Sequence, residues 1–378
     1  YFAGHSLGLM PLKAQQYVNE ELEAWARLGV EGHFHARNPW IPYHENLTSS
    51  FARLVGAKPS EVVAMNSLTV NLHLLMVSFY RPNQKRFKIL IENNTFPSDR
   101  YAVSSQAKFH GFSESSAIVE LEPSADGLTV SSSDVVEQIK SHGDSLALVL
   151  LGNCNYLSGQ RFDFPRVVEA ARSVGAMVGF NLAHGAGNLL LELHDWDVDF
   201  AVWCSYKYLN AGPGGIAGAF VHEKHHRRDL PRFAGWWGHD KQTRFLMGPR
   251  FDPIPSVESW QLSNPPILQL ASLRASMEIF DSAGMITLRQ KGDRLTGYLE
   301  WLLRMKCADW ISIVTPLERG SMLCVRIKSD PKKMLAALKE RQVIVDFREP
   351  DILRMTPVPL YNSFSDVWNL VSVLEKCR

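Results

Sequence analysis

Short apolar runs alternate with helical patterns through the first two thirds of the sequence, and this alternation constrains the fold more than any other feature. The runs predict strands at residues 87–91, 146–151, 177–182, 200–204 and 216–221. Apolar residues at helical spacing predict helices at residues 14–28, 67–79 and 165–174. Near-continuous apolar strands separated by helices are typical of a mostly parallel sheet that is covered on both faces. The sequence therefore predicts an α/β fold around such a sheet.

The remaining third of the sequence has a different pattern. Residues 222–267 are rich in Gly, Pro, Trp and His with little periodicity, which predicts long irregular loops. From residue 268 onward, the pattern predicts helices at 268–280, 288–303, 331–341 and 366–374 and strands at 322–327 and 343–347. This arrangement indicates a smaller α+β domain. We therefore expect an N-terminal segment at residues 1–40, a large domain at 41–267 and a small C-terminal domain at 268–378.

The composition indicates a small-molecule ligand. With 378 residues and 46% hydrophobic content, the chain can bury a large core. Its 40 basic and 39 acidic residues give a formal charge of +1, so no strong field attracts nucleic acid or an anionic membrane. No apolar run approaches the roughly 18 residues that a membrane-spanning helix needs. We therefore expect neither a nucleic-acid nor a membrane partner.

The cysteines and histidines give little sign of a metal site. The five cysteines are widely spaced and include no C-x-x-C pair, which argues against a disulfide framework or a zinc site and favours a reduced, cytoplasmic location. His222, His225 and His226 could suggest a metal site, but no carboxylate or cysteine stands near them at ligand spacing. We expect these histidines to be solvated surface residues, and no metal site.

Lys207 lies just after the predicted strand at 200–204 and before a glycine-rich turn at 210–215. Ligand sites in open α/β sheets form at the carboxyl ends of strands, where residues 181–184 also stand after the strand at 177–182. A partly buried lysine there could lose its proton and form a Schiff base. On this pattern alone, a surface lysine at a turn is the better interpretation.

Two motifs change that interpretation, namely NLAH at residues 181–184 and SYKYLN at 205–210. They resemble the D-x-A-H and S-Y-K-Y-L-N motifs of kynureninases, which are pyridoxal phosphate (PLP) enzymes of fold type I, the aspartate aminotransferase fold of the class V aminotransferase-like family. The resemblance continues through residues 6–9, 66–75 (NSLTVNLHLL), 96–99 (FPSD), 236–239, 263–266 and 357–364 (PVPLYNSF). Kynureninases usually carry several dozen residues before this point and Tyr1 is not a methionine, so we expect an N-terminal truncation.

The resemblance implies that Lys207 carries PLP as a Schiff base. Leu68 and Thr69 would bind the phosphate at the start of a helix, where free amides and the helix dipole favour an anion. The alternative is an ordinary helix cap by Asn66 or Ser67. The resemblance also implies that Phe96 stacks on the pyridine ring and that the other residues around the cofactor are Ser98, Asp99, Asn181, His184 and Tyr206. Without the resemblance, Phe96 would be assigned to the core.

For the substrate, the resemblance implies L-kynurenine or 3-hydroxy-L-kynurenine. Arg354 is suited to a bidentate contact with the substrate α-carboxylate, and the alternative is a structural or surface ion pair. Ser6, His33 and Asn264 correspond to the family's residues around the aryl group, and His33 and Asn264 match relatives that favour the 3-hydroxy substrate. The resemblance also implies that Trp236 and Asn264 bind the cofactor by reaching in from a second subunit, which implies an obligate homodimer.

The implied reaction is hydrolysis of the substrate Cβ–Cγ bond to an anthranilate-type acid and L-alanine, a step of tryptophan catabolism. Asn181 stands where the family has an aspartate, and a neutral amide stabilises a protonated pyridine nitrogen less than a carboxylate does. His5, Gly152 and Asn155 also depart from residues that are common in the family. The alternative is therefore a diverged relative that binds PLP or substrate with impaired or no catalysis. A third hypothesis, cysteine desulfuration, lacks a suitable cysteine-bearing loop.

Overall fold

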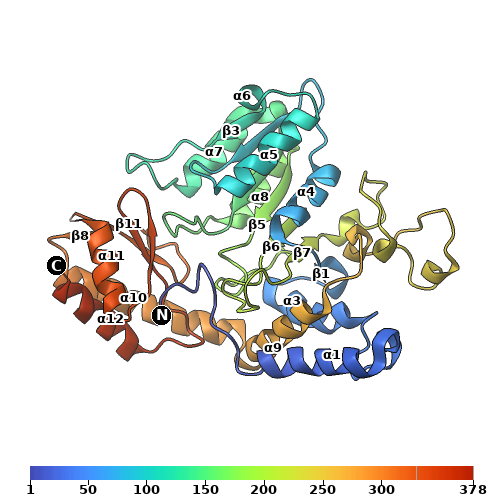
Figure 1. The fold of residues 1–378 in the computed structure, drawn as a ribbon. Coiled ribbons are helices and arrows are strands. Elements are labelled where there is room, and N and C mark those ends of the chain that lie inside the picture. Colours follow the sequence, from blue (N-terminus) through green and yellow to red (C-terminus); the bar gives the residue numbers. More distant parts are fainter. Residues whose placement is uncertain (329, 378) are drawn as a thin grey trace.

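The computed structural model describes residues 1–328 and 330–377 and has a seven-stranded sheet at its centre (Figure 1). The strand order is β1-β7-β6-β5-β4-β2-β3. The five neighbours from β6 to β3 pair in parallel, whereas β7 is antiparallel to both β6 and β1. The strands are β1 (Val62–Ala64), β2 (Lys88–Ile91), β3 (Ile118–Glu120), β4 (Leu146–Gly152), β5 (Met177–Asn181), β6 (Phe200–Trp203) and β7 (Gly218–Val221). The predicted mostly parallel sheet is confirmed.

Both faces of this sheet are buried, as the near-continuous apolar strands predicted. In β6, Phe200 and Val202 belong to one hydrophobic cluster, and Ala201 and Trp203 belong to another on the opposite face. Successive side chains of a strand point to opposite faces, so every residue of such a strand must be apolar. The first eight helices are α1 (Ala14–Leu28), α2 (Gly32–His35), α3 (Thr48–Val55), α4 (Leu68–Phe79), α5 (Pro97–Phe109), α6 (Glu114–Ala117), α7 (Ser132–His142) and α8 (Phe164–Ser173).

A second sheet of four antiparallel strands lies in the C-terminal part of the chain, in the order β10-β11-β9-β8. It has a hydrophobic cluster of its own, to which Phe2 from the start of the chain also belongs. Ala3 pairs with Thr356 at the end of β11, so the N-terminal segment packs on this sheet (Figure 1). The elements are α9 (Ile267–Ala283), α10 (Met285–Lys306), β8 (Ile311–Ile313), β9 (Leu323–Ile327), α11 (Pro331–Glu340), β10 (Asp346–Arg348), β11 (Ile352–Met355) and α12 (Phe364–Lys376).

The predicted irregular segment at residues 222–267 is confirmed, since it holds only short 3-10 turns among its loops. Figure 1 shows part of this segment, drawn in yellow, extending away from the rest of the chain. The predicted strand at 343–347 begins later, at Asp346. Among the described residues, no helix is both long and apolar enough to cross a membrane.

Candidate active site

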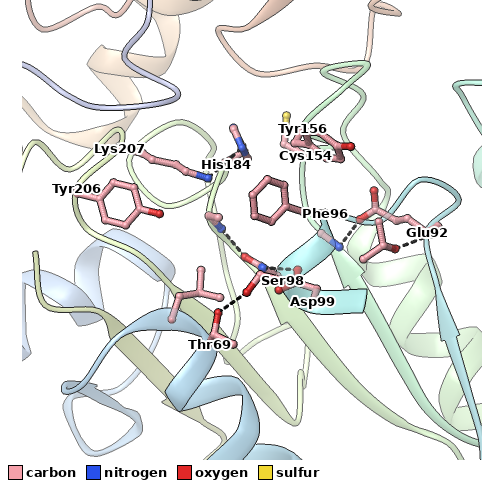
Figure 2. A pocket seen from close by; sticks show the side chains of 15 residues that line it. Thr69, Glu92, Phe96, Ser98, Asp99, Cys154, Tyr156, His184, Tyr206 and Lys207 are labelled. Atoms are coloured by element: carbon pink, nitrogen blue, oxygen red, sulfur yellow. Dashed lines mark hydrogen bonds between the residues drawn. The ribbon is translucent and has the colours of Figure 1, made fainter. Parts of the chain in front are cut away.

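A pocket with a cavity volume of about 120 Å³ opens at the carboxyl ends of the parallel strands. β5 ends at Asn181, β4 ends at Gly152, and Lys207 follows the end of β6. Parallel strands end at the same edge of a sheet, which is why residues so far apart in sequence meet here. The lining residues are Leu68, Thr69, Glu92, Thr95, Phe96, Ser98, Asp99, Gly152, Cys154, Tyr156, Asn181, Ala183, His184, Tyr206 and Lys207 (Figure 2).

Lys207 points toward His184 and the ring of Phe96 (Figure 2). Its Nζ atom lies 3.2 Å from His184 Nε2 and 5.9 Å from the centroid of the Phe96 ring. Burial lowers the pKa of Lys207, and the positive charge of Arg354 lowers it further, against an opposing effect of Cys204. A larger fraction of neutral amine makes Lys207 a better nucleophile and base.

His184 is a neutral neighbour of this lysine. Burial is the main cause that lowers its pKa well below the usual value, and the positive charge of Lys207 acts in the same direction. A neutral imidazole can share a hydrogen bond with the Lys207 amine without adding a second positive charge to the pocket. Its Nδ1 atom is buried and has no hydrogen-bond partner among the described residues.

Two helices begin at the opposite side of the pocket. Thr69 is in the first turn of α4 and Ser98 is in the first turn of α5, and their hydroxyl oxygens lie 2.7 Å apart. The predicted alternative, a side-chain cap, is not formed: Ser67 at the N-cap of α4 makes no capping hydrogen bond. First-turn amides without partners and the positive ends of two helix dipoles suit a phosphate group.

Phe96 is not a core residue, since its side chain is 45% exposed and lines the pocket. Its ring packs edge to face against that of Tyr156, with 5.3 Å between the ring centroids, and this contact restricts the orientation of the Phe96 ring. An exposed aromatic face within a pocket is suited to stacking on a flat ligand ring.

Asn181 and Asp99 are hydrogen-bonded to each other. The Asn181 side-chain Nδ2 donates to Asp99 Oδ2 at 2.5 Å, and its Oδ1 accepts from the backbone N–H of Ala183 at 2.9 Å. Burial raises the pKa of Asp99 to about 6, while Asn181 and Lys207 oppose the rise. The sequence placed Asp99 and Asn181 around the same cofactor but did not indicate the hydrogen bond between them.

Glu92 was not predicted. It follows β2 directly and accepts hydrogen bonds from the Gly152 backbone N–H and, at 2.6 Å, from Asn155 Nδ2. Burial raises its pKa to about 7. A Cβ atom on Gly152 would lie 2.6 Å from Glu92 Oε1, so this glycine leaves room for the carboxylate. An acidic residue just after a buried strand was the signal that could have identified it.

Arg354 and Ser6 lie in a polar network beside the pocket and do not line it. The Arg354 guanidinium donates to Asp346 and, at 2.6 Å, to the Tyr156 carbonyl oxygen. Ser6 Oγ donates to the same Asp346 at 3.0 Å, and His5 Nε2 lies 3.3 Å from it. Arg354 Nε has no hydrogen-bond partner among the described residues. The structural ion pair considered from the sequence is therefore present, and one donor of the guanidinium remains free.

The other predicted substrate and dimer residues lie outside the pocket lining. His33 is on α2, with its ring edge-to-face with Trp40 at 5.3 Å. Trp236 is 43% exposed and donates from Nε1 to the Arg244 carbonyl oxygen. Asn264 is exposed on the loop before α9. Within one copy of the chain, the structure does not bring these three side chains to Lys207.

The expectation that His222, His225 and His226 are solvated surface residues is wrong, because all three are buried. The acidic partners of His222 and His225 come from distant parts of the sequence, which spacing along the chain could not reveal. His225 Nε2 lies 2.8 Å from Asp199 Oδ1. One possible metal-ligand atom from each of Glu61, His194 and His222 lies within 4.8 Å of the other two. Glu61 already accepts hydrogen bonds from the backbone N–H groups of Lys58 and Glu223, both at 2.8 Å.

Comparison with known proteins identifies the family. The family model for the kynureninase C-terminal domain matches residues 288–374. The kynureninase of Myxococcus xanthus is 59% identical over 99% of this chain and 89% of its own length. The kynureninase of Koribacter versatilis is 55% identical over 98% of this chain and 88% of its own length.

Solved structures show the same fold at low sequence identity. A cystine C–S lyase in complex with cysteine persulfide has a TM-score of 0.84 at 17% identity, covering 99% of this chain and 97% of its own. A variant of that lyase, with glycine covalently linked to its PLP cofactor, has a TM-score of 0.82. A cysteine desulfurase from Escherichia coli has a TM-score of 0.82, covering 100% of this chain and 94% of its own.

The predicted fold class, that of fold type I PLP enzymes, is confirmed by these structures. The relatives also confirm the predicted kynureninase-type enzyme function, and none of the comparisons favours the non-catalytic alternative. With 59% identity to a kynureninase over almost its whole length, this chain belongs to the kynureninase family.

Proposed function

We propose that this chain is a PLP-dependent hydrolase that cleaves the Cβ–Cγ bond of L-kynurenine or 3-hydroxy-L-kynurenine. The products are anthranilate or 3-hydroxyanthranilate and L-alanine. The observation that carries the proposal is the half-buried Lys207, which lines one pocket with the exposed Phe96 ring and the first turns of α4 and α5. Its Nζ contacts His184, and burial lowers its pKa. This is the chemistry that PLP needs from a protein.

The residues present fit PLP. The amides and hydroxyls at the starts of α4 and α5, with Thr69 and Ser98, suit its phosphate, and Tyr206 adds a hydroxyl on the same wall. Phe96 offers a ring face, and Asn181 faces the pocket from the end of β5. When bound, PLP supplies an electron sink for the bonds at the substrate Cα and Cβ.

The protein groups supply binding and proton transfer. Because burial lowers its pKa, Lys207 releases a proton from Nζ more readily than an exposed lysine does. His184 stays neutral beside it and keeps the amine oriented through the 3.2 Å contact.

We propose that Arg354 binds the α-carboxylate of the substrate. Its free Nε and its Asp346 contact lie next to the pocket wall formed by Tyr156. A carboxylate ligand would replace Asp346 as the acceptor of a hydrogen bond from the Arg354 guanidinium. Ser6, which the resemblance assigns to the aryl group, donates to the same Asp346 and would therefore address the carboxylate end of the substrate instead.

We propose a homodimer with shared active sites, in which Trp236 and Asn264 of one copy complete the pocket of the other, together with the aryl-group residue His33. Trp236 and Asn264 are exposed, and the segment from α1 to α2 that carries His33 also carries exposed apolar side chains. These are Leu22 (40%), Trp25 (63%), Val30 (72%) and Phe34 (55%). Apolar side chains gathered on a surface mark an interface, and a two-fold dimer brings the same patch of both copies together.

The division of the chain and its location are part of the proposal. We propose an N-terminal segment at residues 1–40, a large PLP-binding domain at 41–267 and a small domain at 268–378, of which residues 329 and 378 lie outside the described residues. The separate hydrophobic clusters of the two sheets support this division. The near-neutral charge supports a cytoplasmic protein without nucleic-acid or membrane partners.

A fluorescence assay tests the function. The purified protein is loaded with PLP and incubated with L-kynurenine or 3-hydroxy-L-kynurenine, and the fluorescent acid is followed. We expect product from the wild-type protein and none from Lys207→Ala at equal concentration and equal folding by circular dichroism. PLP binding without product at any enzyme concentration would instead establish the non-catalytic alternative.

A further inference from the structure

The pocket contains two acidic residues, Glu92 and Asp99, and they differ in what they have left to offer a ligand. Both oxygens of Glu92 accept hydrogen bonds, one from the Gly152 N–H and the other from Asn155. Asp99 uses only Oδ2, which accepts from Asn181, while Oδ1 is buried without a hydrogen-bond partner among the described residues. Asp99 is therefore the pocket acid with an unused acceptor.

Asp99 also lacks a direct ion pair among the described residues. Its side chain sits in the first turn of α5, and the residue is only 7% exposed. The positive charge of Lys207 acts on it, but this effect is smaller than that of burial. A buried carboxylate without a cation is costly, so this site favours a ligand that brings a proton or a positive charge.

The Asn181 amide is locked in one orientation by its two contacts. Its Oδ1 must accept from the Ala183 N–H, and its Nδ2 must donate to Asp99. A flipped amide would place its NH₂ against a backbone N–H and its oxygen against a carboxylate. In the observed orientation, the amide shares the negative charge of Asp99 through a charge-assisted hydrogen bond.

We propose that Asp99, acting with the Asn181 amide, holds the negative charge that keeps the pyridine nitrogen of PLP protonated in this protein. The inference rests on the proposed function, because it concerns the same cofactor. The charge comes from the start of α5 and not from the end of β5, where the residue is a neutral amide. Asp99 Oδ1 is the acceptor left for the proton on the cofactor, and the Asn181 amide holds the carboxylate in place.

The test is ¹⁵N NMR of protein loaded with PLP that is labelled at the pyridine nitrogen. We expect a chemical shift in the protonated range for the wild-type protein at neutral pH. Asp99→Asn, which keeps the shape and removes the charge, should move the shift toward the unprotonated range and weaken PLP binding on the order of 10-fold. The exchange variant Asp99→Asn/Asn181→Asp restores one carboxylate to the pair and should return the shift toward the wild-type value.

Glu92→Gln is the matched control, because it removes the other pocket acid, and it should leave the ¹⁵N shift unchanged. An unchanged shift in Asp99→Asn, or an equal change in Glu92→Gln, would overturn the inference while leaving the proposed function intact. A wild-type protein that binds no labelled PLP would overturn both. If Asp99→Asn fails to fold, the exchange variant decides alone: an unprotonated shift there contradicts the proposed role of the carboxylate.

Discussion

At the scale of single residues, Glu92 gives the clearest pH dependence. Its pKa is about 7 in the folded protein, against 4.5 for an ordinary glutamate. The folded state therefore binds this proton more tightly than the unfolded state. The resulting stabilisation is complete below about pH 4.5 and is lost as the pH rises through 7, and it amounts to on the order of 3 kcal/mol.

We therefore predict that Glu92→Gln reduces the fall in unfolding free energy between pH 5 and pH 8. Urea unfolding at several pH values, at constant PLP concentration, measures this slope. The exposed Glu137→Gln is the control and should keep the wild-type slope. A Glu92→Gln slope equal to that of the wild-type protein would show that Glu92 is not the group responsible.

Arg354 provides a second prediction at this scale. Arg354→Lys keeps the positive charge but loses the planar fork that can bind a carboxylate with two hydrogen bonds. We expect the KM for L-kynurenine to rise on the order of 10-fold, with a smaller change in kcat and unchanged PLP content. Steady-state kinetics measures both constants. If Arg354→Lys instead lowers the PLP content and leaves the KM unchanged, Arg354 stabilises the pocket wall and does not bind the substrate.

Much of the site could be predicted from the sequence, and what was missed has a physical cause. Two motifs that resemble those of kynureninases singled out Lys207, His184 and Asn181. The residues meet because parallel strands end at the same edge of the sheet. The Asn181 contact with Asp99 and the position of Glu92 depend on which helix and strand lie beside each other. No periodicity within one segment encodes that packing.

At the scale of elements, the turn that carries Lys207 is held by the N-terminal segment. The backbone N–H of Gly8 donates to the Tyr206 carbonyl oxygen at 2.8 Å. A Cβ atom on Gly8 would lie 2.3 Å from the Lys207 carbonyl oxygen and 2.2 Å from Asn210 Oδ1. Glycine is therefore required here by the close approach of two backbone segments.

We predict that Gly8→Ala lowers the unfolding free energy by about 1–3 kcal/mol, because the overlap must shift the Lys207 turn. It should also lower the PLP content at limiting PLP. Gly297→Ala is the control, since a Cβ atom at this position in α10 meets no atom within 4 Å. That control should be neutral or slightly stabilising, because alanine is the better helix former. Full stability and PLP content in Gly8→Ala would contradict the account of this turn.

The elements that were predicted are those with a long or strictly apolar pattern. Buried strands such as β4 and β6, and amphipathic helices such as α1 and α8, have such patterns. The strands that were missed, β1, β3, β8 and β11, have only three or four residues, too few to establish a period. α5 was missed because its sequence, PSDRYAVSSQAKF, has a weak apolar face and owes its burial to contacts with α4 and β3.

At the scale of the whole molecule, the proposed dimer makes a quantitative prediction. If each pocket needs Trp236 from the partner, Lys207→Ala and Trp236→Ala are each impaired but for different reasons. Mixing and re-equilibrating the two variants in equal amounts forms hybrid dimers with one intact pocket. We expect roughly a quarter of the wild-type activity per protomer, since half of the dimers are hybrids with one of two sites intact.

Light scattering and activity measurements on the mixture test this dimer. The control is a mixture of Lys207→Ala with itself, which should stay inactive. A monomeric protein, or a dimeric mixture without restored activity, would contradict shared active sites. The exposed Trp25 and Phe34 side chains provide an independent check, because Trp25→Arg should weaken association if the surface around α1 lies in the interface.

Peptide mass spectrometry tests most directly whether Lys207 holds PLP at the strand ends of the sheet. The PLP-loaded protein is reduced with borohydride, digested and mapped for the mass of the reduced cofactor. We expect the reduced cofactor to be attached to Lys207 in the wild-type protein and to be absent from Lys207→Ala. An adduct on another lysine, or a wild-type protein that carries none after loading with PLP, would contradict it.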